Sequence, residues 1–190
     1  MMNFEKKNTL IILIAGKARS GKGEVAKFLQ EKFLEEKKKV IISPYTKYLK
    51  KYICEITGKS FLDEDKPRDL LQKISSELIK KRLGNQDFFL RRQIEDLEFY
   101  HYFMDVVIIP DVRFPEEISR VKERFSNVVS IGIKREGYVS PLTKEQQEDV
   151  TEVSLDDYTD YDYFFKNTSL EVLYEKALEV VRELKKEGRI

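Results

Sequence analysis

One segment of the sequence has the spacing of a phosphate-binding loop. Gly16, Gly21 and Lys22 are placed as in a Gly-x-x-x-x-Gly-Lys pattern. Glycines let backbone N–H groups turn inward around phosphate oxygens, and the lysine can reach the β- and γ-phosphates as a point charge. Gly23 then stands where such loops usually have Ser or Thr. The pattern predicts phosphate binding in preference to an ordinary Gly/Lys-rich surface turn.

A second polar segment follows a later apolar run and could complete the same site. Asp111 and Arg113 come just after residues 106–109. An acidic residue at a strand end can hold Mg²⁺ through water or orient the acceptor, and an arginine there can contact phosphate. The alternative for Asp111 is to cap the helix that Pro115 would begin, and the two roles are compatible. Three further arginines could clamp an acceptor phosphate or the transferred group: Arg19, Arg68 and Arg135.

The elements on either side of the loop predict a parallel α/β unit. The apolar run 9–15 is typical of a buried strand, 24–36 of a helix and 40–42 of a second strand. This order predicts a βαβ unit whose helix aims the positive end of its dipole at the anion. Ligands of open parallel sheets lie beyond the carboxyl ends of the strands. The loop and Asp111 are therefore expected to meet at one edge of the sheet.

A helix-rich insert is expected between the second and third strands. Its third helix is rich in aromatic residues, which at helical spacing are expected to pack in a core and not to stack on bases. Residues 134–150 are expected to form a flexible excursion, and the acidic run 145–162 a solvated face or series of caps. The other predicted helices and strands are 45–57, 67–83, 86–103, 106–109, 115–125, 128–133, 161–165 and a last helix capped by Ser169.

Composition limits the class of protein. The 190 residues, 41% of them hydrophobic, suffice for one well-cored domain, and a net charge of +1 gives no bulk attraction to nucleic acid or anionic membranes. No apolar run reaches the roughly 20 residues that span a bilayer. Cys54 and His101 are the only cysteine and histidine, so no Cys/His metal set or Ser/His/Asp triad can form, and both are expected to pack in helices. These features predict a cytoplasmic domain.

The sequence resembles the bacteriophage-type deoxynucleoside monophosphate kinases. Residues 16–22 and 111–117 are the specific matches. These kinases belong to the nucleoside monophosphate kinase-like group, which includes the animal phosphomevalonate kinases. Weaker stretches keep the family order: 45–50, 67–72 and 151–152, followed by Asp162 and Asn167.

The resemblance implies a three-layer α/β/α sandwich around a five-stranded parallel sheet. Residues 1–190 would form a single P-loop kinase domain, with an acceptor-binding insert at 44–104 and a lid at 135–150. The family uses ATP and Mg²⁺ to convert a (deoxy)nucleoside monophosphate into the diphosphate. Its partners would be small-molecule nucleotides, with no nucleic-acid polymer and no membrane, and a homodimer stays open.

The resemblance also assigns roles to residues. The ATP-binding residues would be Gly16, Lys17, Ala18, Arg19, Ser20, Gly21, Lys22, Gly23 and Glu24. The catalytic residues would be Lys22, Asp111, Arg113 and Arg135, with Asp111 and Glu24 holding the metal. The acceptor would be bound by Tyr45, Lys50, Arg68, Gln72 and Arg113.

Gly23 departs from the family, which usually has Asp at that position. Either Glu24 and Asp111 hold the metal through water, or the catalyst is weaker than its relatives. Two alternatives to a nucleoside monophosphate kinase therefore stay open. One is phosphorylation of a non-nucleotide phosphate, and the other is nucleotide binding with little transfer.

Overall fold

The computed structural model describes residues 4–58, 68–139 and 142–190. The chain divides into two compact units. One runs to Pro44 and resumes at Leu97, and the other is Tyr45–Asp96. The larger unit contains the sheet and the phosphate loop. No helix in the described parts of the chain is long and apolar enough to cross a membrane.

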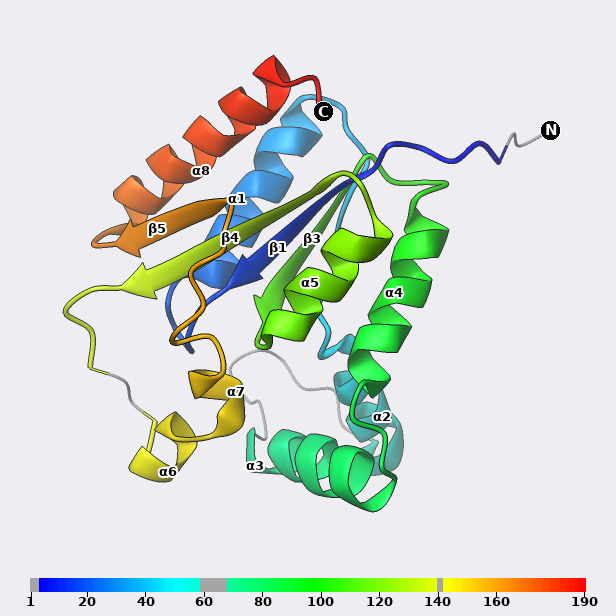
Figure 1. Cartoon of the computed structure of the whole chain (residues 1–190), viewed down its shortest axis with the longest axis vertical. Coiled ribbons are helices and arrows are strands. Elements are labelled where there is room, and N and C mark those ends of the chain that lie inside the picture. The colour runs from blue at the N-terminus through cyan, green and yellow to red at the C-terminus, as the bar shows by residue number, and fades with distance from the viewer. Residues whose placement is uncertain (1–3, 59–67, 140–141) are drawn as a thin grey trace. The chain divides into compact units, whose positions relative to one another are not determined.

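The larger unit is built on five parallel strands in the order β2-β3-β1-β4-β5. Figure 1 shows how the strands run together toward one edge. Their bounds are β1 (Leu10–Ala15), β2 (Val40–Ile42), β3 (Val106–Val112), β4 (Val128–Arg135) and β5 (Tyr163–Asn167). The central β1 is buried along its whole length because helices cover both of its faces. This parallel α/β arrangement confirms the expected fold class.

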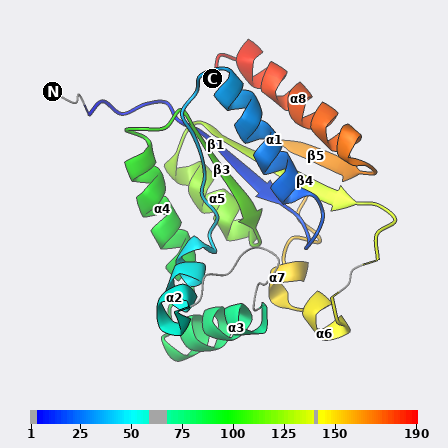
Figure 2. The same cartoon turned by 180° about the vertical axis from the view of Figure 1, so that it is seen from behind.

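The two faces of the sheet are covered by different helices. Helices α1 (Lys22–Glu35) and α8 (Leu170–Lys186) lie on one face and α5 (Pro115–Arg124) on the other (Figures 1 and 2). Alternate β1 residues, such as Ile12 and Ile14, belong to the core cluster that α1 and α8 complete. Ser169 caps α8 as expected, since its hydroxyl accepts a hydrogen bond from the Val172 amide at 3.3 Å.

The smaller unit is helical. Its helices are α2 (Lys47–Thr57), α3 (Arg68–Gln72), the π-helix η2 (Lys73–Arg82) and α4 (Phe88–Tyr100), which continues past the end of the unit. The helix expected over 67–83 is therefore an α-helical turn followed by a π-helix, and residue 67 lies outside the described residues. Cys54 is half-buried in α2.

The aromatic residues of the predicted third helix do not form a core, contrary to expectation. The buried positions of this segment are taken by Leu90, Gln93, Leu97 and His101. Phe99 is 61% exposed, and it packs edge-on or tilted against neighbouring aromatic rings. Helical spacing fixes which residues share a face, but it does not say which face a neighbouring element covers.

The expected ends of two strands, and the absence of helices from the expected excursion, were also wrong. β3 continues through Pro110 and Asp111, where the pairing with β1 shifts register between Leu13 and Ala15. The excursion expected over 134–150 begins inside β4 and contains α6 (Lys144–Gln147), followed at its end by α7 (Val150–Val153). α6 starts from a reciprocal capping box between Thr143 and Gln146, a sequence signal that outweighs the neighbouring proline and glycine.

Candidate phosphate-binding site

The glycine loop is pressed tightly against the sheet and the start of α8. Gly16 and Gly21 have φ values of 146° and 105°. A Cβ atom on Gly16 would lie 2.3 Å from the Ile133 carbonyl oxygen, and one on Gly21 would lie 2.6 Å from Leu173. Only glycine fits these two positions, so the chain can curl back over the end of β1.

Lys22 lies inside this curl. It is the first residue of α1 and is buried, and its ammonium donates hydrogen bonds of 2.6 Å to the carbonyl oxygens of Gly16 and Lys17. Burial, and then the nearby Arg113 guanidinium, lower the pKa of Lys22 from 10.5 to about 7, while Glu152 and Asp111 oppose the shift. A buried ammonium at a helix N-terminus is well placed to bind an anion.

The hydroxyl of Ser20 provides a test of whether the loop fits a phosphate. Ser20 is only 3% exposed, and its Oγ has no hydrogen-bond partner in the described part of the chain. It lies across the loop from Gly16, 2.8 Å from where a Cβ would be. An unsatisfied buried hydroxyl costs about 1–3 kcal/mol. A phosphate oxygen in the loop would accept its hydrogen bond, so the donors present fit a nucleotide phosphate.

The end of β3 brings Arg113 to the loop. Val112 pairs with Ala15 across the parallel ladder, so the residues that follow each strand leave the sheet side by side. The Arg113 guanidinium donates to the Gly16 carbonyl oxygen at 3.5 Å. Its backbone amide donates to the Glu117 carboxylate at 2.7 Å, which fixes the turn into α5.

Asp111 is close enough to Lys22 to raise its pKa, so the loop and the β3 end share one edge of the sheet. It does not cap α5. Phe114 is the N-cap residue of that helix. The capping carboxylate is that of Glu117, which accepts hydrogen bonds from the Arg113 and Phe114 amides. Asp111 is therefore not needed for the cap.

Two residues of the site were not among the expected site residues. The buried Asn167, at the end of β5, donates from its amide to the Ser20 carbonyl oxygen at 2.8 Å and so braces the loop. Glu152, in α7, accepts a hydrogen bond from the Ala18 amide at 2.8 Å and one from Arg113 at 2.7 Å. The family resemblance marked both positions, but their partners in the loop, Ala18 and Ser20, lie 134 and 147 residues away in sequence, which no local pattern reveals.

The remaining loop and lid residues are placed as follows. Arg135, the last residue of β4, donates to the Arg19 carbonyl oxygen at 3.3 Å, and its guanidinium lies 4.3 Å from the Tyr138 ring centroid. Lys17 forms an exposed 2.8 Å ion pair with Asp156. Residues 140 and 141 of the expected lid lie outside the described residues.

The start of α1 differs from the loop before it. Gly23 is exposed, and a Cβ there would meet nothing within 4 Å, so sterics do not demand a glycine. Glu24 is exposed and shares a hydrogen bond with the Tyr174 hydroxyl of α8. Within the described residues, no group of three or more His, Cys, Asp or Glu side chains is arranged to hold a metal ion.

The expected acceptor-binding residues other than Arg113 all belong to the smaller unit. Tyr45 is buried, Lys50 is half-buried in α2, and Arg68 and Gln72 are the first and last residues of α3. Their role in acceptor binding stays a prediction.

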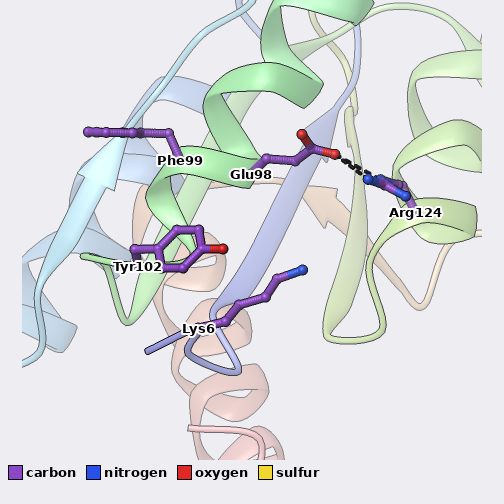
Figure 3. Close-up of a pocket in the computed structure, with 5 residues that line it drawn as sticks. All are labelled: Lys6, Glu98, Phe99, Tyr102 and Arg124. Atoms are coloured by element: carbon purple, nitrogen blue, oxygen red, sulfur yellow. Dashed lines mark hydrogen bonds and ion pairs between the residues drawn. The ribbon is translucent and has the colours of Figure 1, made fainter. Parts of the chain in front are cut away.

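A shallow pocket lies at the opposite edge of the sheet. It is lined by Lys6, Glu98, Phe99, Tyr102 and Arg124, which come from segments that precede β1, β3 and β4 (Figure 3). Arg124 donates from Nε to Glu98 at 2.9 Å across one side of it. The candidate site is thus at the carboxyl edge of the sheet, and this pocket is at the amino edge.

Several solved structures resemble the chain. No protein-family model and no curated protein matches the sequence. An APS kinase from Mycobacterium tuberculosis, solved in complex with AMPPNP and APS, is 13% identical, with a TM-score of 0.54 over 94% of this chain and 99% of that one. A cysteine-to-alanine variant of that enzyme is 14% identical, with a TM-score of 0.53 and the same coverage. A shikimate kinase from Bacteroides thetaiotaomicron is 14% identical, with a TM-score of 0.50 over 93% and 98%. The chain therefore has the fold of P-loop kinases.

Proposed function

We propose that this chain, which has the fold of P-loop kinases, is an ATP-dependent phosphotransferase that acts on a (deoxy)nucleoside monophosphate. One observation carries the proposal. The buried Lys22 ammonium, the Arg113 guanidinium and the orphaned Ser20 hydroxyl converge at the loop. Two positively charged groups and an unsatisfied hydroxyl donor gathered at one glycine loop are the groups that a polyphosphate site requires.

The triphosphate of ATP would lie in the loop. Loop amides and the Ser20 hydroxyl would donate to its oxygens, and Lys22 would bridge to the β- and γ-phosphates. The N-terminus of the 14-residue helix α1 would add its dipole. An AMPPNP-bound structure of one neighbour, the APS kinase, supports ATP as the donor for this fold.

Asp111 fits Mg²⁺ better than Glu24 does. Asp111 is near Lys22 at the strand ends, whereas Glu24 shares its hydrogen bond with Tyr174 on α8. Asp111 would hold the ion through water, with most ligands coming from phosphate oxygens. When bound, Mg²⁺ would neutralise charge on the phosphates.

The transfer asks little covalent chemistry of the protein. A phosphate oxygen of the acceptor would attack the γ-phosphorus as its bond to the β-phosphate oxygen breaks, which gives a diphosphate and ADP. Arg113 would hold the acceptor phosphate, and Arg19 and Arg135 would neutralise the moving group. Removing one such donor typically costs about 3 kcal/mol of transition-state stabilisation.

Two observations keep the other candidates in view. The shikimate kinase among the structural neighbours shows by its name that this fold also serves a non-nucleotide acceptor. Gly23 lacks the hydroxyl that usually helps to hold Mg²⁺, which favours nucleotide binding with slow transfer.

A panel of acceptors tests the three candidates together. ADP release is measured with ATP and each deoxy- and ribonucleoside monophosphate, then with phosphorylated alcohols and with hydroxyl acceptors, in the presence and absence of Mg²⁺. Release that depends on a nucleoside monophosphate and on Mg²⁺ supports the proposal. Release with a non-nucleotide alone, or Mg·ATP binding by calorimetry without any acceptor-dependent release, rejects it in favour of the first or second alternative.

A further inference from the structure

The carboxylate of Glu152 joins three segments that are distant in the sequence. One oxygen accepts from the Ala18 amide in the loop at 2.8 Å, and the other accepts from the Arg113 guanidinium at 2.7 Å. The Glu152 side chain is only 10% exposed. A carboxylate with both oxygens engaged at charge-assisted distances, and nearly excluded from water, is more strongly held than a surface ion pair.

The turn that carries Glu152 is itself fixed. The Asp149 carboxylate caps α7 by accepting from the Thr151 amide at 2.9 Å and from its hydroxyl at 2.6 Å. The Thr151 carbonyl oxygen in turn accepts from the Arg113 guanidinium at 3.4 Å. Since backbone and side chain of the same turn both face Arg113, Glu152 reaches it without having to order a loose segment.

Of the hydrogen bonds that Arg113 Nη1 makes to described residues, the one to Glu152 is the shortest. The bonds to the Gly16 and Thr151 carbonyl oxygens are 3.5 and 3.4 Å long and weak. Arg113 and Lys22 are two positive charges beside the same loop, and the Arg113 charge disfavours the charged form of the buried Lys22. Glu152 is therefore the group that determines where the guanidinium lies.

We propose that Glu152 is a positioning residue: by pairing with Arg113 while it holds the Ala18 amide, it sets the guanidinium at the mouth of the phosphate loop. The inference rests on the proposed function, in which Arg113 contacts the acceptor phosphate. Glu152 acts through Arg113 and does not itself touch the reacting atoms. A displacement of about 1 Å of such a group can cost on the order of 100-fold in rate.

Three substitutions separate this role from a general loss of structure. E152Q keeps the size but offers one acceptor oxygen, and its amide group cannot accept from a second donor. E152D keeps the charge but is one methylene too short to reach both Ala18 and Arg113. E148Q makes the same charge change at an exposed position four residues earlier and serves as the control.

We expect kcat and the KM for the acceptor to change much more than the KM for ATP. E152Q and E152D are expected to lower kcat by about 10- to 100-fold and to raise the KM for the acceptor, with the KM for ATP within about 3-fold of wild type. E148Q is expected to match wild type. In a double-mutant cycle with R113K, the double variant should lose little more than either single variant, because both remove the same contact.

Either of two opposite results would overturn the proposal. If E152Q binds ATP more tightly and keeps its kcat, the carboxylate only occupies the loop and yields to the nucleotide. Additive losses in the cycle with R113K would also overturn it, because they would mean that the two residues act separately.

A measurement without substrate separates this inference from the proposed function. In the nucleotide-free chain, E152Q should shift the amide signal of Ala18 and broaden the side-chain N–H signal of Arg113 in NMR spectra, while E148Q leaves both unchanged. Unchanged signals in E152Q would reject the positioning role even if the chain proves to be a kinase. Altered signals in a chain that transfers phosphate to no acceptor would reject the proposed function, while Glu152 would still be the residue that fixes Arg113.

Discussion

At the carboxyl edge of the sheet the ammonium of Lys22 is buried against backbone carbonyl groups, whereas at the amino edge the side chain of Lys7 is 36% exposed and its ammonium pairs with Asp105 at 2.7 Å. The arginines differ in the same way. Arg113 is mostly buried beside Glu152, while the side chains of Arg124 and Glu98 are 61% and 44% exposed. The same three strands, β1, β3 and β4, lead into both edges.

The contrast shows that the two edges of one sheet can hold charged groups in different environments, exposed at one edge and buried at the other. Exposed pairs such as those of the amino edge contribute little to stability and are easily replaced. Buried cations cost free energy on folding, because water no longer solvates them. At the carboxyl edge the buried Lys22 and the mostly buried Arg113 lie beside an unsatisfied hydroxyl, which supports the proposal that a ligand completes a site there.

The largest effect is expected from removing the ammonium at the carboxyl edge. Lys22→Ala should lower kcat/KM by at least about 100-fold, because the β/γ-phosphate contact is lost. Its melting temperature should not fall, since the substitution also removes the cost of burying a charge. Lys7→Ala at the amino edge should keep full activity. Equal activity in the two variants would contradict the claim that only the carboxyl edge carries a functional lysine.

The two arginines provide the second comparison. Arg113→Ala should raise the acceptor KM and lower kcat, together about 10- to 100-fold in kcat/KM, because the acceptor phosphate loses its partner and Glu152 is left buried without one. Arg124→Ala removes an exposed pair and should change neither kcat nor unfolding free energy by a measurable amount. Wild-type acceptor kinetics in the Arg113 variant would show that Arg113 is not part of the site.

A proton balance should accompany nucleotide binding. The folded chain has a Lys22 pKa of about 7, against 10.5 for an ordinary lysine, so between these values the folded, nucleotide-free protein has lost a proton that the unfolded chain keeps. This contribution to stability therefore rises with pH across the window. ATP favours the charged ammonium, so its binding should take up a proton and weaken as pH rises above about 7.

Calorimetry at about pH 8.5 in two buffers of different ionisation enthalpy measures this uptake. Wild type should show a buffer-dependent heat, and Lys22→Met, which has no ammonium to protonate, should show much less. A wild-type heat that is the same in both buffers would mean that Lys22 is already charged before ATP binds.

The smallest effect is expected at the amino edge. His101 is buried and stacks on Phe125, and burial lowers the pKa of its imidazole although a hydrogen bond with the Leu97 carbonyl oxygen opposes the shift. As pH is lowered below about 6.5, His101 is protonated in the unfolded chain before it is protonated in the folded chain. The free energy of unfolding therefore decreases as pH is lowered, until the pH is below the folded pKa. Urea unfolding should show that the free energy of unfolding falls less between pH 7 and pH 5 in His101→Gln than in wild type, with a difference of less than about 1 kcal/mol. Parallel curves would show that His101 keeps an ordinary pKa.

The parts of the fold and site that follow from local sequence could be predicted. β1 and the loop are one continuous pattern, and the placement of Asp111 and Arg113 at the same edge follows from the parallel sheet. His101 is a packed residue, as expected. The element ends were harder to predict, because β3 passes through a proline at a shift in register.

The rest of the site depends on contacts that connect remote segments. Glu152 meets Ala18 across 134 residues, and Asn167 meets Ser20 across 147. In the acidic run, the expected caps include Asp149, but Glu152 is nearly buried and does not belong to a solvated face. Charge runs indicate exposure on average, and they do not reveal the one member that has a buried cation to meet.

The pairing of Val112 with Ala15 has a consequence for motion. The glycine loop and Arg113 follow neighbouring central strands, and neither can slide along the other without breaking the ladder between β1 and β3. The loop and Arg113 therefore stay fixed relative to each other. In the proposed phosphotransferase, any opening and closing that admits substrates must come from elements outside those two strand ends, and turnover would then be timed by parts of the chain that hold none of the donor phosphates.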